Sequence, residues 1–424
     1  MTMAGEKSRS AQRERTRSAI VDAAFTLFTR LGYRAVSLRD IAAEAGISHP
    51  ALLKYYSGKE ELLACVLQRL EEDSGVMTCA DVARGSIAEL PFSLIARSNI
   101  DVVGYLPFFS ALVGEAAAPS HPAHETMRAR AASLRPHAAA IVETAQEETL
   151  VGDGREPEAE SMRLLAAWDA LQVIEQYLPG RVDVVRTLER HEGLLSFPFG
   201  WRAPSESSVA GGDLVANSAE RVRLVAPSPP EAGYRSGRAR RERILTDAMT
   251  LFAREGYANT SLREIAERVG VSKSALYHHF ASKDALLLGV LEERDRQIDE
   301  NMDISMASGA SALRAMPHGA LSNERDAPGL IEVYAVISCE ALPSGHPAHS
   351  YFTRRFSQAL DSFTELFREA AAAGDLPEHR DPEHEALWLL ALWDGLQYHW
   401  LYDRDSVDIA AHLRAHLEDV LPPR

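Results

Sequence analysis

Two short segments of this chain carry hydrogen-bonding and basic side chains at closely matching positions. One reads Ser48-His49-Pro50-Ala51 and the other Ser272-Lys273-Ser274-Ala275. In each segment a serine is placed to cap a helix, and the imidazole or amine that follows can donate hydrogen bonds to phosphate oxygens and base edges. The residue types therefore favour recognition of a polyanion.

Both segments belong to a longer stretch that occurs twice. Residues 17–63 align without a gap with residues 241–287, and 21 of the 47 aligned positions are identical. Further matches lie 225 residues apart, including Trp168 with Trp393 and Asp183 with Asp408. This self-similarity predicts that one whole domain of about 200 residues has been copied.

The elements expected around each segment form a helix-turn-helix. Gly32 is placed to end a first helix, and Ser37 with Asp40 has the spacing of a capping box that opens a second. Gly46 then permits a turn, and Ser48 caps a third helix, which in this layout enters a major groove. The second copy repeats the devices with Gly256, Ser261, Glu264, Gly270 and Ser272.

The second copy resembles the TetR family of bacterial repressors. The resemblance lies in Gly256-Tyr257, Ser-Leu-Arg-Glu-Ile-Ala from Ser261, Gly-Val-Ser-Lys-Ser-Ala-Leu-Tyr-His-His-Phe from Gly270, and Ser-Lys-Asp-Ala-Leu from Ser282. It implies an all-α fold of two tandem TetR-like units. Each unit would be a three-helix DNA-binding domain followed by a helical ligand-binding and dimerisation domain.

The first copy is similar to the same family but departs from its pattern. Leu53 stands where the family usually has Tyr, Tyr56 replaces the usual Phe, and Gly58 replaces a common Ser. The domain boundaries expected for the whole chain are 1–65 and 66–203 for the first unit, 204–234 for a Ser-, Gly- and Pro-rich linker, and 235–289 and 290–424 for the second unit.

Side-chain chemistry predicts which residues contact DNA. Base edges are within reach of His49, Pro50, Ala51, Lys54 and Tyr55 in the first copy and of Lys273, Ser274, Ala275 and His278 in the second. Phosphate contacts are predicted for Lys59, Tyr277, Lys283 and the helix starts that carry Ser37, Arg39, Ser48, Ser261, Arg263 and Ser272. Basic arms that enter the minor groove are predicted around Arg13, Arg15 and Arg17 and around Arg235, Arg238, Arg240 and Arg241.

These assignments have structural alternatives. Packing of the third helix onto the next is the alternative for Tyr55, Tyr56, His279 and Phe280. The arginine-rich arms are alternatively solubilising tails, and Lys59 and Lys283 are alternatively solvated charges at a helix start.

Charge is distributed unevenly along the chain. The net charge is −16, yet residues 1–60 and 235–284 each hold 10 basic and 6 acidic residues, which leaves −24 on the remainder. Two basic modules on an acidic body favour one docking orientation on DNA. The N-terminal residues lack the apolar segment of a secretory signal, no apolar run is long enough to span a bilayer, and the three cysteines lack metal-type spacing. A cytoplasmic protein is therefore expected.

The family resemblance also predicts how the units associate. TetR-like proteins dimerise through their last two helices, for which the candidates are Pro157–Tyr177 with Val182–Leu195 and Pro382–Trp400 with Ser406–Leu421. Since one chain holds both sets, we expect the four-helix bundle to close intramolecularly, as a pseudo-dimer; a further dimer of chains stays open. The unlike reading segments then predict an operator with two unlike half-sites.

A small-molecule effector is the second partner that the resemblance implies. Apolar and aromatic candidates for its pocket are Tyr105, Phe108, Phe109, Trp168 and Tyr177 in the first unit and Tyr334, Phe352, Phe356, Trp393 and His399 in the second. Ordinary core packing is the alternative for each. No cofactor or metal is expected, because the pairs His121/His124 and His346/His349 lack a further ligand beside them and are read as part of a helix start.

The sequence therefore predicts a ligand-responsive transcriptional repressor that binds double-stranded DNA. A DNA-organising protein without effector is the first alternative. An enzyme acting on a small apolar molecule is the second, but the chain has no nucleophile elbow, phosphate loop, dinucleotide fingerprint or zinc-protease motif. We expect that the protein is not an enzyme.

Overall fold

The computed structural model describes residues 2–33, 36–73, 87–204, 235–301 and 309–423. Within these residues the regular structure is helical apart from one isolated β-bridge between Pro179 and Val182. The expected all-α fold is therefore confirmed.

The two units consist of helices in the same order. The first unit contains α1 (Thr2–Leu31), α2 (Leu38–Glu44), α3 (His49–Leu52), α4 (Lys59–Asp73), α6 (Phe92–Asp101), α7 (Tyr105–Glu115), α8 (His124–Glu147), α9 (Pro157–Tyr177) and α10 (Val184–Leu194). The second contains α11 (Arg235–Asn259), α12 (Leu262–Val269), α13 (Lys273–His279), α14 (Lys283–Asn301), α15 (Gly309–Asp326), α16 (Pro328–Glu340), α17 (His349–Ala372), α18 (Pro382–Tyr402) and α19 (Ile409–Val420). The helix bounds expected for the dimerisation segments are met within a few residues.

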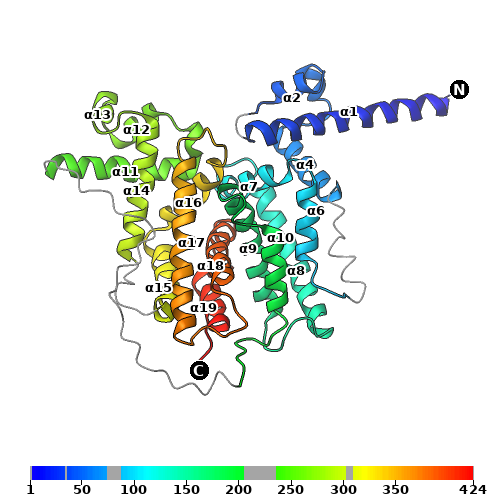
Figure 1. The fold of residues 1–424 in the computed structure, drawn as a ribbon. Coiled ribbons are helices and arrows are strands. Elements are labelled where there is room, and N and C mark those ends of the chain that lie inside the picture. Colours follow the sequence, from blue (N-terminus) through cyan, green and yellow to red (C-terminus); the bar gives the residue numbers. More distant parts are fainter. Residues whose placement is uncertain (1, 34–35, 74–86, 205–234, 302–308, 424) are drawn as a thin grey trace.

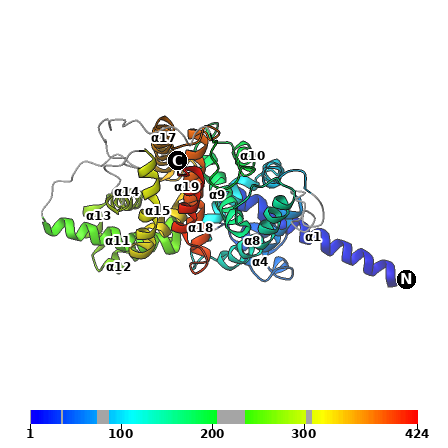
Figure 2. The same cartoon turned by 90° about the horizontal axis from the view of Figure 1, so that it is seen from below.

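The units lie side by side in one body, with both helix-turn-helix heads at the same end (Figure 1). Helices α9 and α18 occupy the centre of this body, and the view from below shows the remaining body helices on either side of them (Figure 2). The expected boundaries at 65 and 289 fall inside α4 and α14, so a continuous helix joins each head to its body.

The contact between the units follows an approximate twofold relation. The Tyr177 hydroxyl donates to the Ser338 carbonyl at 2.5 Å, and the Tyr402 hydroxyl donates to the Val113 carbonyl at 2.6 Å. Tyr402 lies 225 positions after Tyr177, and Ser338 lies 225 after Val113. Duplicated residues therefore make the same contact in both directions.

Repeated aspartates explain one of the duplicated motifs. Asp183 accepts from the Arg186 amide at 2.9 Å, and Asp408 accepts from the Ala411 amide at 2.8 Å, so each caps the last helix of its unit. A side-chain cap satisfies an amide that the first turn of a helix leaves without a backbone partner.

Two expectations on the connecting segments have different outcomes. Except for Pro204, the expected linker lies outside the described residues, as does Cys79. The expected N-terminal arms are wrong as arms, because Arg13, Arg15 and Arg17 lie within α1 and α11 already begins at Arg235. An α-helix is about 10 Å wide, which the minor groove of about 6 Å does not admit.

Candidate nucleic-acid interface

Each head has a small apolar core that orients its third helix. Ile41 and Ile265 are fully buried, and the small Ala42 and Ala266 beside them are also buried. Both expected capping boxes are present, with Ser37 and Ser261 as the N-caps of α2 and α12. The turn that follows needs a left-handed backbone, which Gly46 and Gly270 supply at φ values of 68° and 73°.

The third helix of the second head presents a polar face to solvent. Helix α13 is capped by the Ser272 hydroxyl, which accepts from the Ala275 amide at 3.1 Å. Lys273, Ser274, Tyr277 and His278 are exposed on this helix, whereas Leu276 is buried in the head. Of the residues expected to reach DNA from this helix, Ala275 is half-buried and the others are exposed.

The third helix of the first head is shorter and less polar. Helix α3 contains only four residues, and its N-cap Ser48 makes no side-chain capping bond. Pro50 and the nearby Lys54 are exposed, while His49, Ala51 and Tyr55 are half-buried. Leu53 and its counterpart Tyr277 are both 45% exposed, so the two heads present different chemistry at the same place.

The lysines that open α4 and α14 have a structural role that the sequence did not suggest. Lys59 Nζ donates to the Tyr33 and Val36 carbonyls, each at 2.6 Å, and lies 4.3 Å from the centre of the Tyr33 ring. Lys283 lies 4.1 Å from the centre of the Tyr257 ring, and burial lowers its pKa. Both lysines thus tie the loop after the first helix to the connecting helix. A contact of either lysine with DNA phosphate, as predicted from the sequence, must compete with these interactions within the head. The sequence feature that could have indicated this structural role is the repeat of Gly-Tyr and of the lysine in both copies.

Arg17 and Arg241 also make equivalent contacts. Their guanidinium carbons each lie 5.1 Å from the centre of an aromatic ring, that of Tyr56 in the first head and Phe280 in the second. Both rings are buried, as the packing alternative expects. These two arginines therefore pack on the aromatic residue that follows the third helix, and their predicted contact with DNA stays a prediction.

The other side chains predicted to contact phosphate differ in the bonds that they already make within the head. Ser37 donates through its hydroxyl to Asp40 Oδ2 at 2.6 Å, so it is occupied by its capping box. Arg39 is exposed, and Arg263 is exposed while paired with Glu267 at 2.8 Å. Contacts between DNA phosphates and the backbone amides at the starts of α2 and α12 stay a prediction.

A glutamate joins the second head to its body. The Glu340 carboxylate, at the end of α16, accepts from the Tyr257 amide through Oε2 and from the Ala258 amide through Oε1, each at 2.6 Å. These amides directly follow Gly256, where the backbone takes a positive φ of 76°. The loop between the first and second helices of the head is thus held by the body.

The repeated histidines form matching turns beside this loop. The Ala123 amide donates to His121 Nδ1 at 3.1 Å, and the Ala348 amide donates to His346 Nδ1 at 3.2 Å. His124 and His349 each begin a helix, α8 and α17. Among the described residues there is no group of three or more potential ligands arranged for a metal ion.

Most expected pocket residues of the first unit lie in the core or between the units. Tyr105 and Phe109 stack at 5.6 Å, and Phe108 packs against Phe28 of the head. Tyr177 contacts Phe352 and other rings of the second unit. Within the described residues these side chains therefore serve core packing and the contact between the units, and Trp168 is partly buried against the core.

A cavity of about 40 Å³ lies within the body of the second unit. Two of the expected residues, Tyr334 and Trp393, line it, whereas Phe352, Phe356 and His399 do not. His399 instead lies 3.2 Å from Asp169 of the first unit. The polar residues on the cavity wall, which the sequence did not single out, are Arg294, Asn323, Arg355, Asp394 and Gln397.

Electrostatics around this cavity centre on Tyr334. The guanidinium carbons of Arg294 and Arg355 lie 4.1 and 5.0 Å from the centre of its ring, and its hydroxyl donates to Asp394 at 3.0 Å. Burial raises the pKa of Asp394 to about 6. Arg355 pairs with Asp295 at 2.9 Å, yet its buried Nε has no hydrogen-bond partner among the residues that the structure describes. The sequence feature that could have indicated this site is the presence of charged residues on otherwise apolar helices.

Comparison with known proteins identifies both heads. Residues 20–66 and 244–290 each match the family described as bacterial regulatory proteins, tetR family, and residues 339–422 match the C-terminal part of BetI-type transcriptional repressors. No helix among the described residues is long and apolar enough to cross a membrane.

Three similar proteins each match less than half of this chain. The HTH-type transcriptional regulator YerO of Bacillus subtilis (strain 168) is 49% identical over 53 residues, 12% of this chain and 18% of its own length. The HTH-type transcriptional regulator TtgR of Pseudomonas putida is 29% identical over 184 residues, 40% of this chain and 83% of its own. A solved TetR family regulator from Agrobacterium tumefaciens is 22% identical, covers 44% of this chain and 99% of its own, and has a TM-score of 0.39.

Proposed function

The chain belongs to the TetR family of transcriptional regulators, with two of the family's DNA-binding segments in tandem, and we propose that it acts as a single-chain pseudo-dimer. In this proposal one polypeptide places two unlike heads on one operator with two unlike half-sites. The chain is a regulator and not an enzyme, and repression by occupancy of a promoter is the action proposed here.

One observation carries the proposal. Both heads lie at the same end of a body that is closed by contacts within the chain, as the reciprocal bonds of Tyr177 and Tyr402 illustrate (Figure 1). Two heads on one face can occupy two successive major-groove sections, about one helical turn apart. Because α3 and α13 differ in length and in exposed residues, the two half-sites need not be related by symmetry.

The test is selection of bound sequences from random duplex DNA, followed by footprinting of the full chain. We expect one site with two unlike halves. The double variant His49→Ala/Lys54→Ala should lose protection in one half, and Lys273→Ala/His278→Ala in the other. A perfect inverted repeat bound equally by both heads would contradict the proposal. Absence of sequence preference would favour the DNA-organising alternative.

We also propose that the cavity of the second unit is the effector site. Its volume of about 40 Å³ is far below the roughly 300–1,000 Å³ of most ligand pockets, so a ligand must widen it. Arg294 on the cavity wall belongs to α14, the helix that begins in the head at Lys283. A ligand that binds better to one position of α14 therefore shifts the position of the head.

A further inference from the structure

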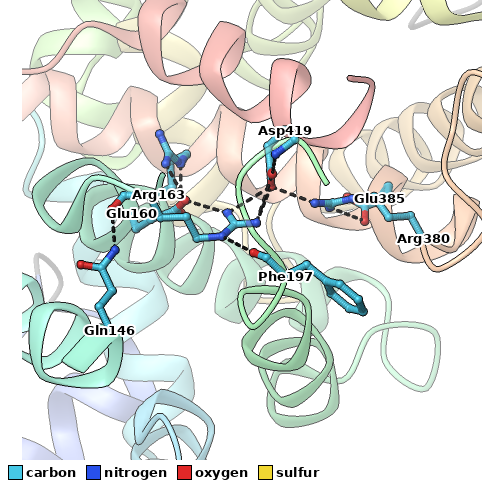
Figure 3. A network of polar contacts seen from close by, with 9 residues as sticks. Gln146, Glu160, Arg163, Phe197, Arg380, Glu385 and Asp419 are labelled. Carbon is cyan, nitrogen blue, oxygen red and sulfur yellow. Dashed lines mark hydrogen bonds and ion pairs between the residues drawn. The ribbon is translucent and has the colours of Figure 1, made fainter. Parts of the chain in front are cut away.

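Six charged side chains are buried together where the two units meet (Figure 3). Arg155, which precedes α9, pairs with Glu160 at 2.9 Å, and Arg380, which precedes α18, pairs with Glu385 at 3.0 Å. These two pairs occupy duplicated positions, 225 residues apart. Up to this point the cluster obeys the pseudo-twofold relation.

Asp419 breaks that relation. This residue of α19 accepts from Arg155 Nη2 through Oδ1 at 3.0 Å and from Arg380 Nη2 through Oδ2 at 2.8 Å. The Gly200 amide also donates to Oδ1, at 2.7 Å. The position in the first unit that corresponds to Asp419 is Leu194. A single carboxylate of the second unit therefore serves the duplicated arginines of both units.

Arg163 is the second asymmetric member of the cluster. Its Nη2 lies 2.8 Å from Glu160 Oε1 in the first unit. The corresponding residue of the second unit is Trp388, whose ring stacks on His191 of the first unit with 3.4 Å between ring centres. The first unit thus contributes an additional buried cation, and the second contributes an additional buried anion.

Charges in the cluster balance only when unlike units meet. The pair seen here contains three arginines and three carboxylates. Two copies of the first unit would bring four arginines and two carboxylates, because each supplies Arg155, Arg163 and Glu160. Two copies of the second would bring two arginines and four carboxylates, because each supplies Arg380, Glu385 and Asp419. An uncompensated buried charge costs several kcal/mol per ion.

Side-chain volumes select the same pairing independently. Gly114 of α7 and Cys339 of α16 occupy duplicated positions and face each other, and a β-carbon at Gly114 would lie 2.3 Å from the Cys339 sulfur. Two first units would therefore place glycine against glycine and leave a gap, whereas two second units would place thiol against thiol in overlapping space.

We infer that the surface of each unit is specific for the unlike unit and rejects a second copy of itself. The inference rests on the pseudo-dimer proposed above and adds a rule of recognition between its halves. Its consequence is that every assembled body, whether closed within one chain or between two chains, carries one head of each kind.

The test uses the full chain with a protease site inserted between residues 205 and 234 and cleaved after folding. Isotopically labelled and unlabelled cleaved protein are mixed, unfolded in urea, refolded and measured by native mass spectrometry. We expect pairs of unlike fragments in all label combinations and no pairs of like fragments. Like pairs in statistical proportion would overturn the inference. Since no DNA is present, this result is independent of operator binding.

A gain of pairing separates recognition from simple loss of stability. Leu194→Asp gives the first unit the carboxylate it lacks, so a pair of such first units would hold four arginines and four carboxylates. We expect pairs of the variant first fragment to appear in the same experiment, in smaller amounts than the unlike pairs because the gap at Gly114 remains, while Leu194→Asn, which has similar size and no charge, yields none. Asp419→Asn in turn is expected to reduce the unlike pairs at least tenfold. Failure of Leu194→Asp to form like pairs while its unlike pairs persist would count against the charge rule.

Discussion

The carbonyl oxygen of Ala166 in α9 lies 1.7 Å from the place that a β-carbon on Gly395 of α18 would occupy. The central helices of the two units therefore touch backbone to backbone at this point. The duplicated position in the first unit is Ala170, so this close approach is specific to one side of the interface.

Gly395→Ala is expected to destabilise the protein because the added methyl group must push α9 and α18 apart. Overpacking of this kind costs about 1–3 kcal/mol in the free energy of unfolding. Urea unfolding followed by circular dichroism measures it. Gly329→Ala is the control, since it is also helical and an added β-carbon there meets nothing within 4 Å. Alanine favours a helix by up to about 1 kcal/mol over glycine, so the two variants should differ in sign.

Acid is expected to weaken the interface through its buried histidines. Burial lowers the pKa of His384 and of His416 to about 3, whereas an unfolded chain titrates near 6.5. Between about pH 3 and pH 6.5 the unfolded state therefore binds more protons than the folded state. The contribution of the neutral histidines to the free energy of unfolding is thus complete above pH 6.5 and is lost as the pH falls. The contribution of each histidine to the free energy of unfolding should fall by about 2 kcal/mol between pH 7 and pH 5.

The variant His416→Gln isolates this contribution. Asp394, whose pKa burial raises to about 6, changes stability in the opposite sense, so wild type and variant are compared as differences between pH 7 and pH 5. We expect the variant to show the smaller difference in urea unfolding. An equal difference in both proteins would show that His416 does not change its protonation on unfolding.

Glu340→Gln is expected to loosen the second head. A glutamine oxygen can replace one of the two acceptors that the Tyr257 and Ala258 amides use, but its NH₂ group cannot accept a hydrogen bond. The amide left without its acceptor costs about 1–3 kcal/mol. Hydrogen exchange of these two amides should accelerate, and the exposed Glu378→Gln should leave them unchanged.

The exposed residue at the end of each third helix offers a reciprocal test of DNA binding. Tyr277→Leu removes a hydroxyl that is predicted to bind phosphate, and Leu53→Tyr introduces one at the duplicated position. We expect the first variant to weaken operator binding severalfold for all sequences and the second to strengthen it. Titrations of a fixed operator by fluorescence anisotropy measure both. Changes in sequence preference instead of affinity would assign these residues to base reading.

Ala359→Leu is expected to fill part of the cavity in the second unit, because Ala359 lies on its wall. Binding of the anionic aromatic probe 8-anilinonaphthalene-1-sulfonate should weaken at least tenfold, since the arginines of the wall favour an anion and the added side chain occupies the space. Operator affinity should stay within twofold of wild type. Equal probe binding by both proteins would place the probe elsewhere.

Much of the fold follows from local sequence. The capping serines Ser37 and Ser261 and the glycines Gly46 and Gly270 determine their turns through bonds to residues a few positions away. Such features can be read from sequence because the interacting groups are near neighbours. The duplication itself also predicted that two similar units would pack within one chain.

Other features depend on residues far apart in the chain, and only the tertiary structure decided them. Lys59 was expected to contact phosphate but is occupied by carbonyls more than 20 positions earlier. Asp419 showed no pattern in the sequence, yet it joins arginines that are 225 positions apart. The repeated motifs determined which helices form and where they begin and end, because these depend on local bonds. How buried charge and volume are matched across the interface depends on which side chains meet, and that is settled only when the two units close on each other.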